Sequence, residues 1–125
     1  MMYLSIAIGG ALGACARYGV GTFAIRFFGI GYPYGTLIVN ILGSFLMGAL
    51  IEYMAQRWSP SPEIRSLLVT GFLGAFTTFS TFSLDVAVQV QKGDYLIAGG
   101  YILLSVVLSI AGLFAGLHLL RLAFS

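Results

Sequence analysis

Hydroxyl and aromatic side chains alternate in one stretch of this sequence, residues 71–83, which reads GFLGAFTTFSTFS. It combines glycines, five hydroxyl residues and four phenylalanines inside an otherwise apolar segment. Because Ser and Thr compete with helical hydrogen bonding and glycine loosens a helix, the pattern predicts a break near residues 74–78. Backbone groups freed at membrane depth are tolerated only where protein or a water-filled cavity receives them. We therefore expect a broken membrane helix that lines an ion path, with free carbonyls suited to a cation such as Na⁺.

Phenylalanines recur at every third position of this stretch, at Phe76, Phe79 and Phe82. The spacing predicts an aromatic stripe along one face, which in most helices serves packing alone. Here Ser80 and Thr81 lie between two of the rings, which is unusual for a surface that faces lipid. Because the edge of an aromatic ring carries the positive end of its quadrupole, ring edges can face an anion.

Two further polar residues occur inside apolar segments. Arg17 is a charged residue at membrane depth, where charge is costly and indicates a functional site. It either offers a positive charge at the mouth of a vestibule or extends to the membrane interface. Asn40 has wholly apolar flanks, so its amide must find partners inside the protein. It either clasps two helices together or offers its NH₂ group to a dehydrated anion.

Three hydroxyl groups follow one face of the last apolar segment, at Tyr101, Ser105 and Ser109. At a rise of 1.5 Å per residue they extend along about 12 Å of helix. They form either a polar track or, for the serines, hydrogen bonds back to their own helix. Hydroxyls, an amide and ring edges together make a donor-rich lining without strong permanent charge, which suits a small anion that must enter and leave.

Other kinds of chemistry find no support in the residue types. The sequence has no HExxH or CxxC motif, and its one histidine, His118, lies near the chain end. We therefore expect neither a transition-metal site nor a nucleophile–base pair, and so no enzyme. A net charge of +2 is too small to predict nucleic acid as a partner.

The elements that must position these residues are membrane helices. The 125 residues are 59% hydrophobic and 8% charged, whereas soluble domains carry about 25% charged residues. A spanning helix needs about 20 mostly apolar residues. Four segments qualify, approximately residues 3–25, 34–55, 64–90 and 95–122. No basic residue precedes the first segment, so we expect a membrane helix there and not a cleaved signal peptide. We predict one all-α transmembrane domain over residues 1–125, embedded in a lipid bilayer.

The arrangement of these helices follows from loops, charges and small residues. Short loops make consecutive helices antiparallel neighbours. Three arginines lie on the side of the termini and two cations on the other, which is a very weak positive-inside signal. We therefore expect insertion in both orientations and an antiparallel homodimer, unless an assembly factor overrules the weak bias. Glycine pairs at Gly9–Gly13 and Gly112–Gly116 predict close helix packing.

With these residues in view, the sequence strongly resembles the Fluc/CrcB family of small microbial fluoride channels. Three blocks carry the resemblance: residues 9–18 (GGALGACARY), 35–45 (GTLIVNILGSF) and 71–83. The third block is highly specific, whereas the first alone would be weak. Together with the chain length and four spans, the resemblance covers nearly the whole sequence. It implies a dual-topology homodimer in the microbial cell membrane, with two antiparallel pores at the subunit interface.

The resemblance also implies roles for particular residues. Phe79 and Phe82 correspond to the two phenylalanines whose ring edges line the fluoride path. Asn40 corresponds to the pore-lining asparagine, and Arg17 to the arginine near the vestibule. The implied polar track consists of these hydroxyl residues: Ser80, Thr81, Tyr101, Ser105 and Ser109.

The resemblance further implies a structural Na⁺ at the centre of the dimer. Backbone carbonyls of Gly74 and Thr77 from both subunits would hold it. Asp85 falls where some members carry an acid near the pore.

Passive fluoride export is the function that the resemblance implies. HF enters cells as a neutral acid, ionises and is trapped as F⁻, and the inside-negative potential drives the anion out at about 2.3 kcal/mol per 100 mV. One alternative is a small multidrug-type, proton-coupled exporter, which would need a membrane-embedded carboxylate where the first helix offers Arg17. Another is an accessory membrane subunit, in which every polar residue would serve packing only.

Overall fold

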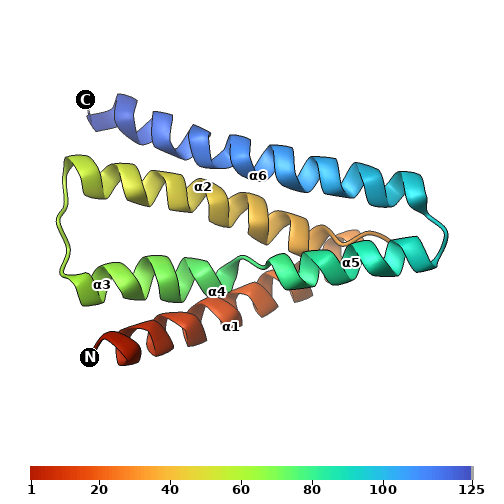
Figure 1. Ribbon diagram of the computed structural model, residues 1–125, viewed down its shortest axis with the longest axis horizontal. Coiled ribbons are helices and arrows are strands. Elements are labelled where there is room, and N and C mark those ends of the chain that lie inside the picture. The colour runs from red at the N-terminus through yellow and green to blue at the C-terminus, as the bar shows by residue number, and fades with distance from the viewer. Residues whose placement is uncertain (125) are drawn as a thin grey trace.

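The architecture is a set of long helices, seen in a computed structural model that describes residues 1–124 (Figure 1). Within those residues every regular element is helical. Four helical stretches are long and apolar enough to cross a membrane, which confirms that prediction. The elements are α1 (Met2–Phe28), α2 (Tyr34–Gln56), α3 (Pro62–Ser66), the π-helical η1 (Leu67–Leu73), α4 (Gly74–Phe76), α5 (Phe79–Gln91) and α6 (Tyr95–Phe124).

The helix ends follow from local sequence. Gly29 ends α1 with a φ of 83°, and Gly93 turns the chain between α5 and α6 with a φ of 82°. Both angles lie in the left-handed region that favours glycine. At the start of α3, the N–H of Ile64 donates to Ser61 Oγ at 3.3 Å, and Pro62 occupies the first turn. A side-chain cap followed by proline is a strong start signal for a helix.

Two residues with extended backbone separate α4 from α5. Thr77 has φ −87° and ψ 160°, and Thr78 has φ −154° and ψ 123°. The hydroxyl of Thr78 then caps α5, because its Oγ1 accepts the N–H of Thr81 at 3.1 Å. The α3–α5 stretch, residues 62–91, therefore has helical backbone on both sides of a short extended segment.

Consecutive long helices run antiparallel, and both chain ends lie at the same end of the molecule (Figure 1). The most extensive contacts nevertheless join elements that are not consecutive. The blue α6 packs along α2, and the red α1 packs along η1 and α4. The interruption at residues 77–78 consequently lies between α1 on one side and α2 on the other.

Glycines allow the closest of these helix contacts. A Cβ atom at Gly9 or Gly13 would collide with the backbone of η1, at Leu67 and Phe72 respectively. On the other side of the molecule, a Cβ at Gly116 would collide with the backbone of α2. The prediction that these small residues serve close packing is confirmed.

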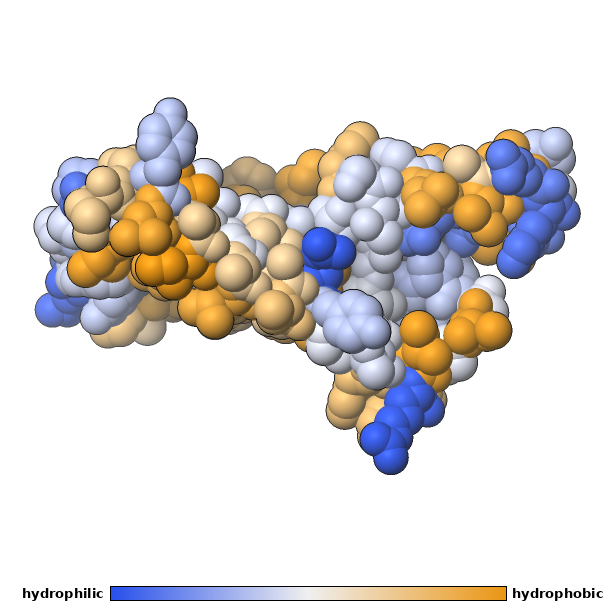
Figure 2. Space-filling view, turned by 90° about the horizontal axis from the view of Figure 1, so that it is seen from below, coloured by the Kyte–Doolittle hydropathy of each residue, from blue (hydrophilic) through white to orange (hydrophobic). Residues whose placement is uncertain are grey.

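Apolar side chains cover much of the outside of the molecule. Large apolar residues such as Leu12, Leu103 and Leu108 are exposed along the long helices. Figure 2 shows one face on which hydrophobic and pale, weakly polar areas cover most of the surface, whereas the most hydrophilic residues form separate small groups. A surface of this kind matches a lipid environment, in which helices satisfy their own backbone groups.

Candidate functional site

Asn40 of α2 joins the interruption of the α3–α5 stretch through two hydrogen bonds. The N–H of Thr78 donates to Asn40 Oδ1 at 2.8 Å, and Asn40 Nδ2 donates to the Thr78 carbonyl at 3.0 Å. The expectation that Asn40 clasps two helices is therefore confirmed. Since an amide nitrogen carries two hydrogens, one donor of Nδ2 remains for the alternative role toward an anion.

Arg17 of α1 reaches the same interruption from the opposite side. Its Nε donates to the carbonyl of Ala75 at 3.0 Å. The carbonyls at the end of a helix have no helical partner and carry partial negative charge, so a guanidinium is favourable there. Arg17 is thus a half-buried contact to the backbone of α4, and it lines a cavity of about 280 Å³ with Thr36, Thr78 and Thr81.

The extended segment deprives two carbonyls of their helical partners. In a continuous helix, the carbonyl of Gly74 would accept the N–H of Thr78, but that N–H donates to Asn40. Likewise the carbonyl of Thr77 would accept the N–H of Thr81, which instead donates to Thr78 Oγ1. Gly74 and Thr77 are the two residues whose carbonyls the family resemblance implies as ligands of Na⁺.

The phenylalanines do not form one continuous stripe, so that prediction is wrong. Phe76 is buried and stacks on Phe72 of η1, with ring centroids 6.0 Å apart. Phe79 and Phe82 form a separate pair on α5, with centroids 5.4 Å apart and planes at 48°. The reason is the extended backbone at residues 77–78, which changes the direction of side chains beyond it. Phe82 is 7% exposed and Phe79 76% exposed.

A cavity of about 330 Å³ lies beside this ring pair. We call it the phenylalanine cavity; its lining residues are Asn40, Ser44, Thr77, Thr78, Phe79, Phe82, Ser105, Val106, Ser109 and Ile110. The buried Oγ atoms of Ser105 and Ser109 have no hydrogen-bond partner within residues 1–124. The alternative that these serines bond back to their own helix is therefore wrong, and their hydroxyls remain available at the cavity wall.

The other predicted hydroxyl residues lie elsewhere. Ser80 is exposed and lines none of the three cavities described in residues 1–124; its Oγ lies 3.4 Å from Thr78 Oγ1. Thr81 lines the cavity of Arg17. Tyr101 is fully buried, and its hydroxyl donates to Asp85 Oδ2 at 2.9 Å. The predicted track is therefore divided between two cavities and a buried tyrosine.

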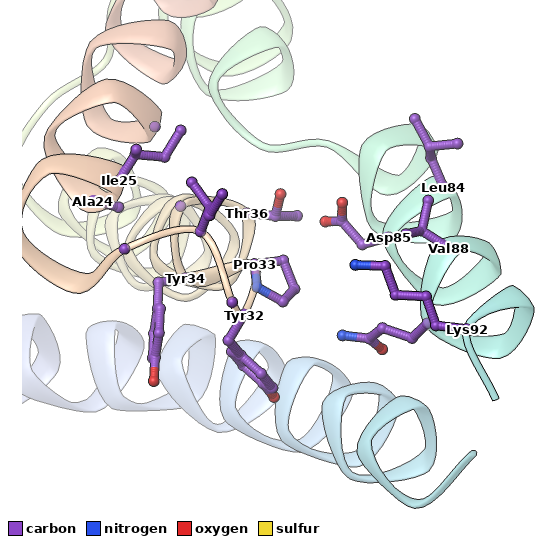
Figure 3. Close-up of a pocket in the computed structure, with 16 residues that line it drawn as sticks. Ala24, Ile25, Tyr32, Pro33, Tyr34, Thr36, Leu84, Asp85, Val88 and Lys92 are labelled. Carbon is purple, nitrogen blue, oxygen red and sulfur yellow. The ribbon is translucent and has the colours of Figure 1, made fainter. Parts of the chain in front are cut away.

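A third cavity, of about 340 Å³, contains residues that sequence reasoning missed (Figure 3). Thr36, Gln89 and Lys92 line it together with Asp85. Thr36 could have been found, because it precedes Asn40 by one helical turn on the same face. Tyr32 lies in the loop at its edge; burial raises the pKa of this tyrosine above its ordinary value, and neighbouring Tyr34 raises it further. Its hydroxyl therefore stays a protonated donor at neutral pH.

Comparison with known proteins identifies relatives of this chain. Residues 4–117 match the family described as CrcB-like protein, Camphor Resistance (CrcB). The chain is 50% identical to a protein of Rhodospirillum centenum named fluoride-specific ion channel FluC, over 98% of this chain and 97% of that one. A protein of the same name from Agrobacterium fabrum is 52% identical to this chain, over 93% of each chain. Another from Caulobacter vibrioides is 50% identical, over 98% of this chain and 97% of that one.

These matches extend over nearly the whole chain. Every residue assigned to the candidate site lies within residues 4–117, which match the family. Four membrane-capable helices agree with a multi-pass protein of the cell membrane. The chain belongs to the CrcB family.

Proposed function

We propose that this protein is a fluoride channel that lets F⁻ leave the cytoplasm passively. One observation carries the proposal: Phe79 and Phe82 share a cavity with Asn40 and with the unpaired hydroxyls of Ser105 and Ser109. Relatives named fluoride-specific ion channels, about half identical over most of the chain, support the choice of ion. Export needs no coupled energy source, because the membrane potential drives an anion outward.

The lining of the phenylalanine cavity suits a small anion. Ser105 and Ser109 each carry a hydroxyl hydrogen that no protein group within residues 1–124 engages. Within residues 1–124, the amide of Asn40 donates one N–H to the carbonyl of Thr78 and has no partner for the other. Ring edges of Phe79 and Phe82 complete a wall of partial positive charge. None of the described residues that line this cavity carries a full charge, so an anion would be stabilised without being trapped.

An antiparallel homodimer with two pores would complete this wall. Phe79 is 76% exposed although it belongs to the cavity, so a second subunit has surface to cover there. Long runs of exposed apolar residues and nearly balanced loop charges support both lipid contact and insertion in either orientation. Tags on both termini should therefore be reported on both sides of the membrane, and a single-sided result would contradict dual topology.

A structural Na⁺ fits the interruption of the third span, which we interpret as a functionally broken membrane helix. The carbonyls of Gly74 and Thr77 have lost their helical amides to Asn40 and to Thr78 Oγ1. Carbonyl oxygens are ligands that Na⁺ takes at unwound membrane helices. Gly74 is exposed in one subunit, so its carbonyl can meet that of a partner across the dimer centre. The ion would neutralise the partial negative charge of these carbonyls and join the two subunits.

Reconstitution tests the function directly. Purified protein in liposomes loaded with potassium fluoride should release fluoride when valinomycin dissipates the potential, and chloride-loaded liposomes should release far less. Equal release from protein-free liposomes would contradict the channel. Proton-driven uptake of an organic cation without fluoride release would instead favour the multidrug-type exporter.

A further inference from the structure

The third cavity lies at the end of the molecule where α5 stops and residues 29–33 join α1 to α2. Of its sixteen lining residues, Asp85 and Lys92 are the two with charged side chains. Figure 3 shows Asp85 on α5 and Lys92 directly after the end of that helix, with both side chains extending from it toward the loop of residues 29–33. Within residues 1–124 these two side chains form no ion pair, although they line the same cavity.

The same cavity is polar enough to hold water. The side chain of Gln89 lines it and is 8% exposed, yet its Oε1 has no hydrogen-bond partner within residues 1–124. Buried acceptors in folded proteins are satisfied by protein or by ordered water. A polar cavity of about 340 Å³ has room for several waters, each of which takes about 30 Å³ in the liquid. The cavity, which we call the opening, is therefore polar and large enough to admit water.

Tyr101 connects this opening to the phenylalanine cavity. Its ring lies 5.2 Å from that of Phe82, which lines the phenylalanine cavity, and its hydroxyl donates to Asp85. Thr36 lines both the opening and the cavity of Arg17. The opening is therefore the next polar space between the candidate fluoride site and the end of the bundle.

Asp85 creates an electrostatic problem for an anion that uses this opening. A carboxylate at a narrow polar mouth repels F⁻, and low-dielectric walls strengthen the repulsion. Lys92 is the one cation that lines the cavity, and its flexible stem lets the ammonium follow the carboxylate. Arg26 is the other cation near this end, but it is exposed and does not line the cavity.

We propose that Lys92 recruits anions at this mouth by offsetting the charge of Asp85, so that fluoride can pass the carboxylate. This inference rests on the proposed fluoride conduction. Lys92 affects the rate of fluoride efflux and the dependence of that rate on salt, whereas Phe79 and Phe82 line the path itself. A residue that only stabilised the helix end would not make the rate depend on ionic strength.

The test compares fluoride efflux from liposomes for Lys92→Gln, Lys92→Glu and Lys92→Arg, with Arg26→Gln and Arg26→Glu as matched controls. At low ionic strength the Debye length is about 30 Å, so charges at the mouth act on ions with little screening. Under these conditions we expect Lys92→Glu to slow fluoride efflux about tenfold and Lys92→Gln to slow it less, because charged clefts change the local ion concentration. Lys92→Arg and both Arg26 variants should stay within about twofold of wild type, because they keep the charge of the cavity.

Two further measurements separate the outcomes. High concentrations of an impermeant salt should shrink the Lys92→Glu effect, and the effect of Lys92→Gln should be smaller in an Asp85→Asn background. Wild-type fluoride efflux by Lys92→Glu at low salt, or an Arg26→Glu effect of equal size, would overturn the role of Lys92 but not the proposed fluoride conduction. A wild-type protein that releases no fluoride would overturn the proposed function and this inference with it.

Discussion

Asn40 and Thr78, 38 residues apart, exchange two hydrogen bonds of 2.8 and 3.0 Å. The side chain of one residue thereby satisfies both backbone groups of the other, at the point where the helix is interrupted. This amide clasp replaces helical bonding for Thr78 and leaves the carbonyl of Gly74 without its usual partner. One polar side chain thus supports both the proposed anion-lining wall and the carbonyls proposed for Na⁺.

Substitution of Asn40 should therefore affect stability as well as flux. Asn40→Ala leaves the N–H and C=O of Thr78 unpaired, which costs about 1–3 kcal/mol for each group that water does not reach. Asn40→Asp places a carboxylate oxygen against the Thr78 carbonyl, and because an unpaired charge at membrane depth is costly, its loss of stability should be at least as large. Thermal unfolding in detergent measures the loss of stability in both variants, and fluoride efflux from liposomes measures the loss of flux.

Ser44→Ala is the matched control for this series. Ser44 lies one turn beyond Asn40 and lines the same cavity, but it makes no hydrogen bond to α4 or α5 in the described chain. The free energy of unfolding of Ser44→Ala should therefore lie within about 0.5 kcal/mol of the wild-type value, as is usual for substitutions that break no structural contact. Equal destabilisation by Ser44→Ala and Asn40→Ala would contradict a structural role for the clasp.

The hydroxyl of Thr78 should influence Na⁺ binding. In Thr78→Val, the N–H of Thr81 loses its cap and can bond the carbonyl of Thr77, which competes with the ion. Loss of such a cap also costs about 1 kcal/mol of stability. We expect the Na⁺ concentration that half-protects the protein against unfolding to rise several-fold, whereas Thr78→Ser, which keeps the cap, should resemble wild type.

Removal of Na⁺ gives the control for that experiment. Exchange of Na⁺ for a bulky organic cation should lower the unfolding temperature of the wild type, because ligands that bind only the folded state stabilise it. A wild-type unfolding temperature that ignores Na⁺ at every concentration would argue against the site.

Two glycines of α1 provide a test of the packing. A Cβ at Gly13 would collide with the backbone of Phe72, whereas a Cβ at Gly19 would meet nothing within 4 Å. Gly13→Ala should therefore destabilise the protein by about 1–3 kcal/mol, as overpacking does. Gly19→Ala should be neutral or slightly stabilising, since alanine favours helix by up to about 1 kcal/mol over glycine. Similar unfolding temperatures for both variants would contradict the close contact of α1 with η1.

The membrane helices could be predicted from sequence because hydropathy is a local property. The run of hydroxyls and glycines also predicted a break near residues 74–78, and Thr77 and Thr78 there have extended backbone. The partner of Arg17 could not be predicted in this way. Ala75 lies 58 residues away, and only the packing of α1 against α4 brings its carbonyl to the guanidinium.

The prediction of one phenylalanine stripe was wrong for a related reason. Regular spacing predicts one face only if the backbone stays helical, and residues 77–78 separate Phe76 from the later rings. Gln89 and Lys92 could not be predicted as cavity residues, because polar residues are the ordinary expectation for a helix end at a membrane surface. Their role depends on the loop of residues 29–33, which encloses a cavity against them.

The central claim is that the rings of Phe79 and Phe82 line the fluoride path. Fluoride efflux from liposomes should be abolished in Phe79→Ile and Phe82→Ile, because isoleucine keeps apolar bulk but has no ring edge to face an anion. Phe114→Ile is the control, since Phe114 is an exposed ring on α6 that lines none of the three cavities described in residues 1–124. Size-exclusion chromatography should show the same assembly for all variants. Wild-type fluoride efflux in both ring variants would contradict the account.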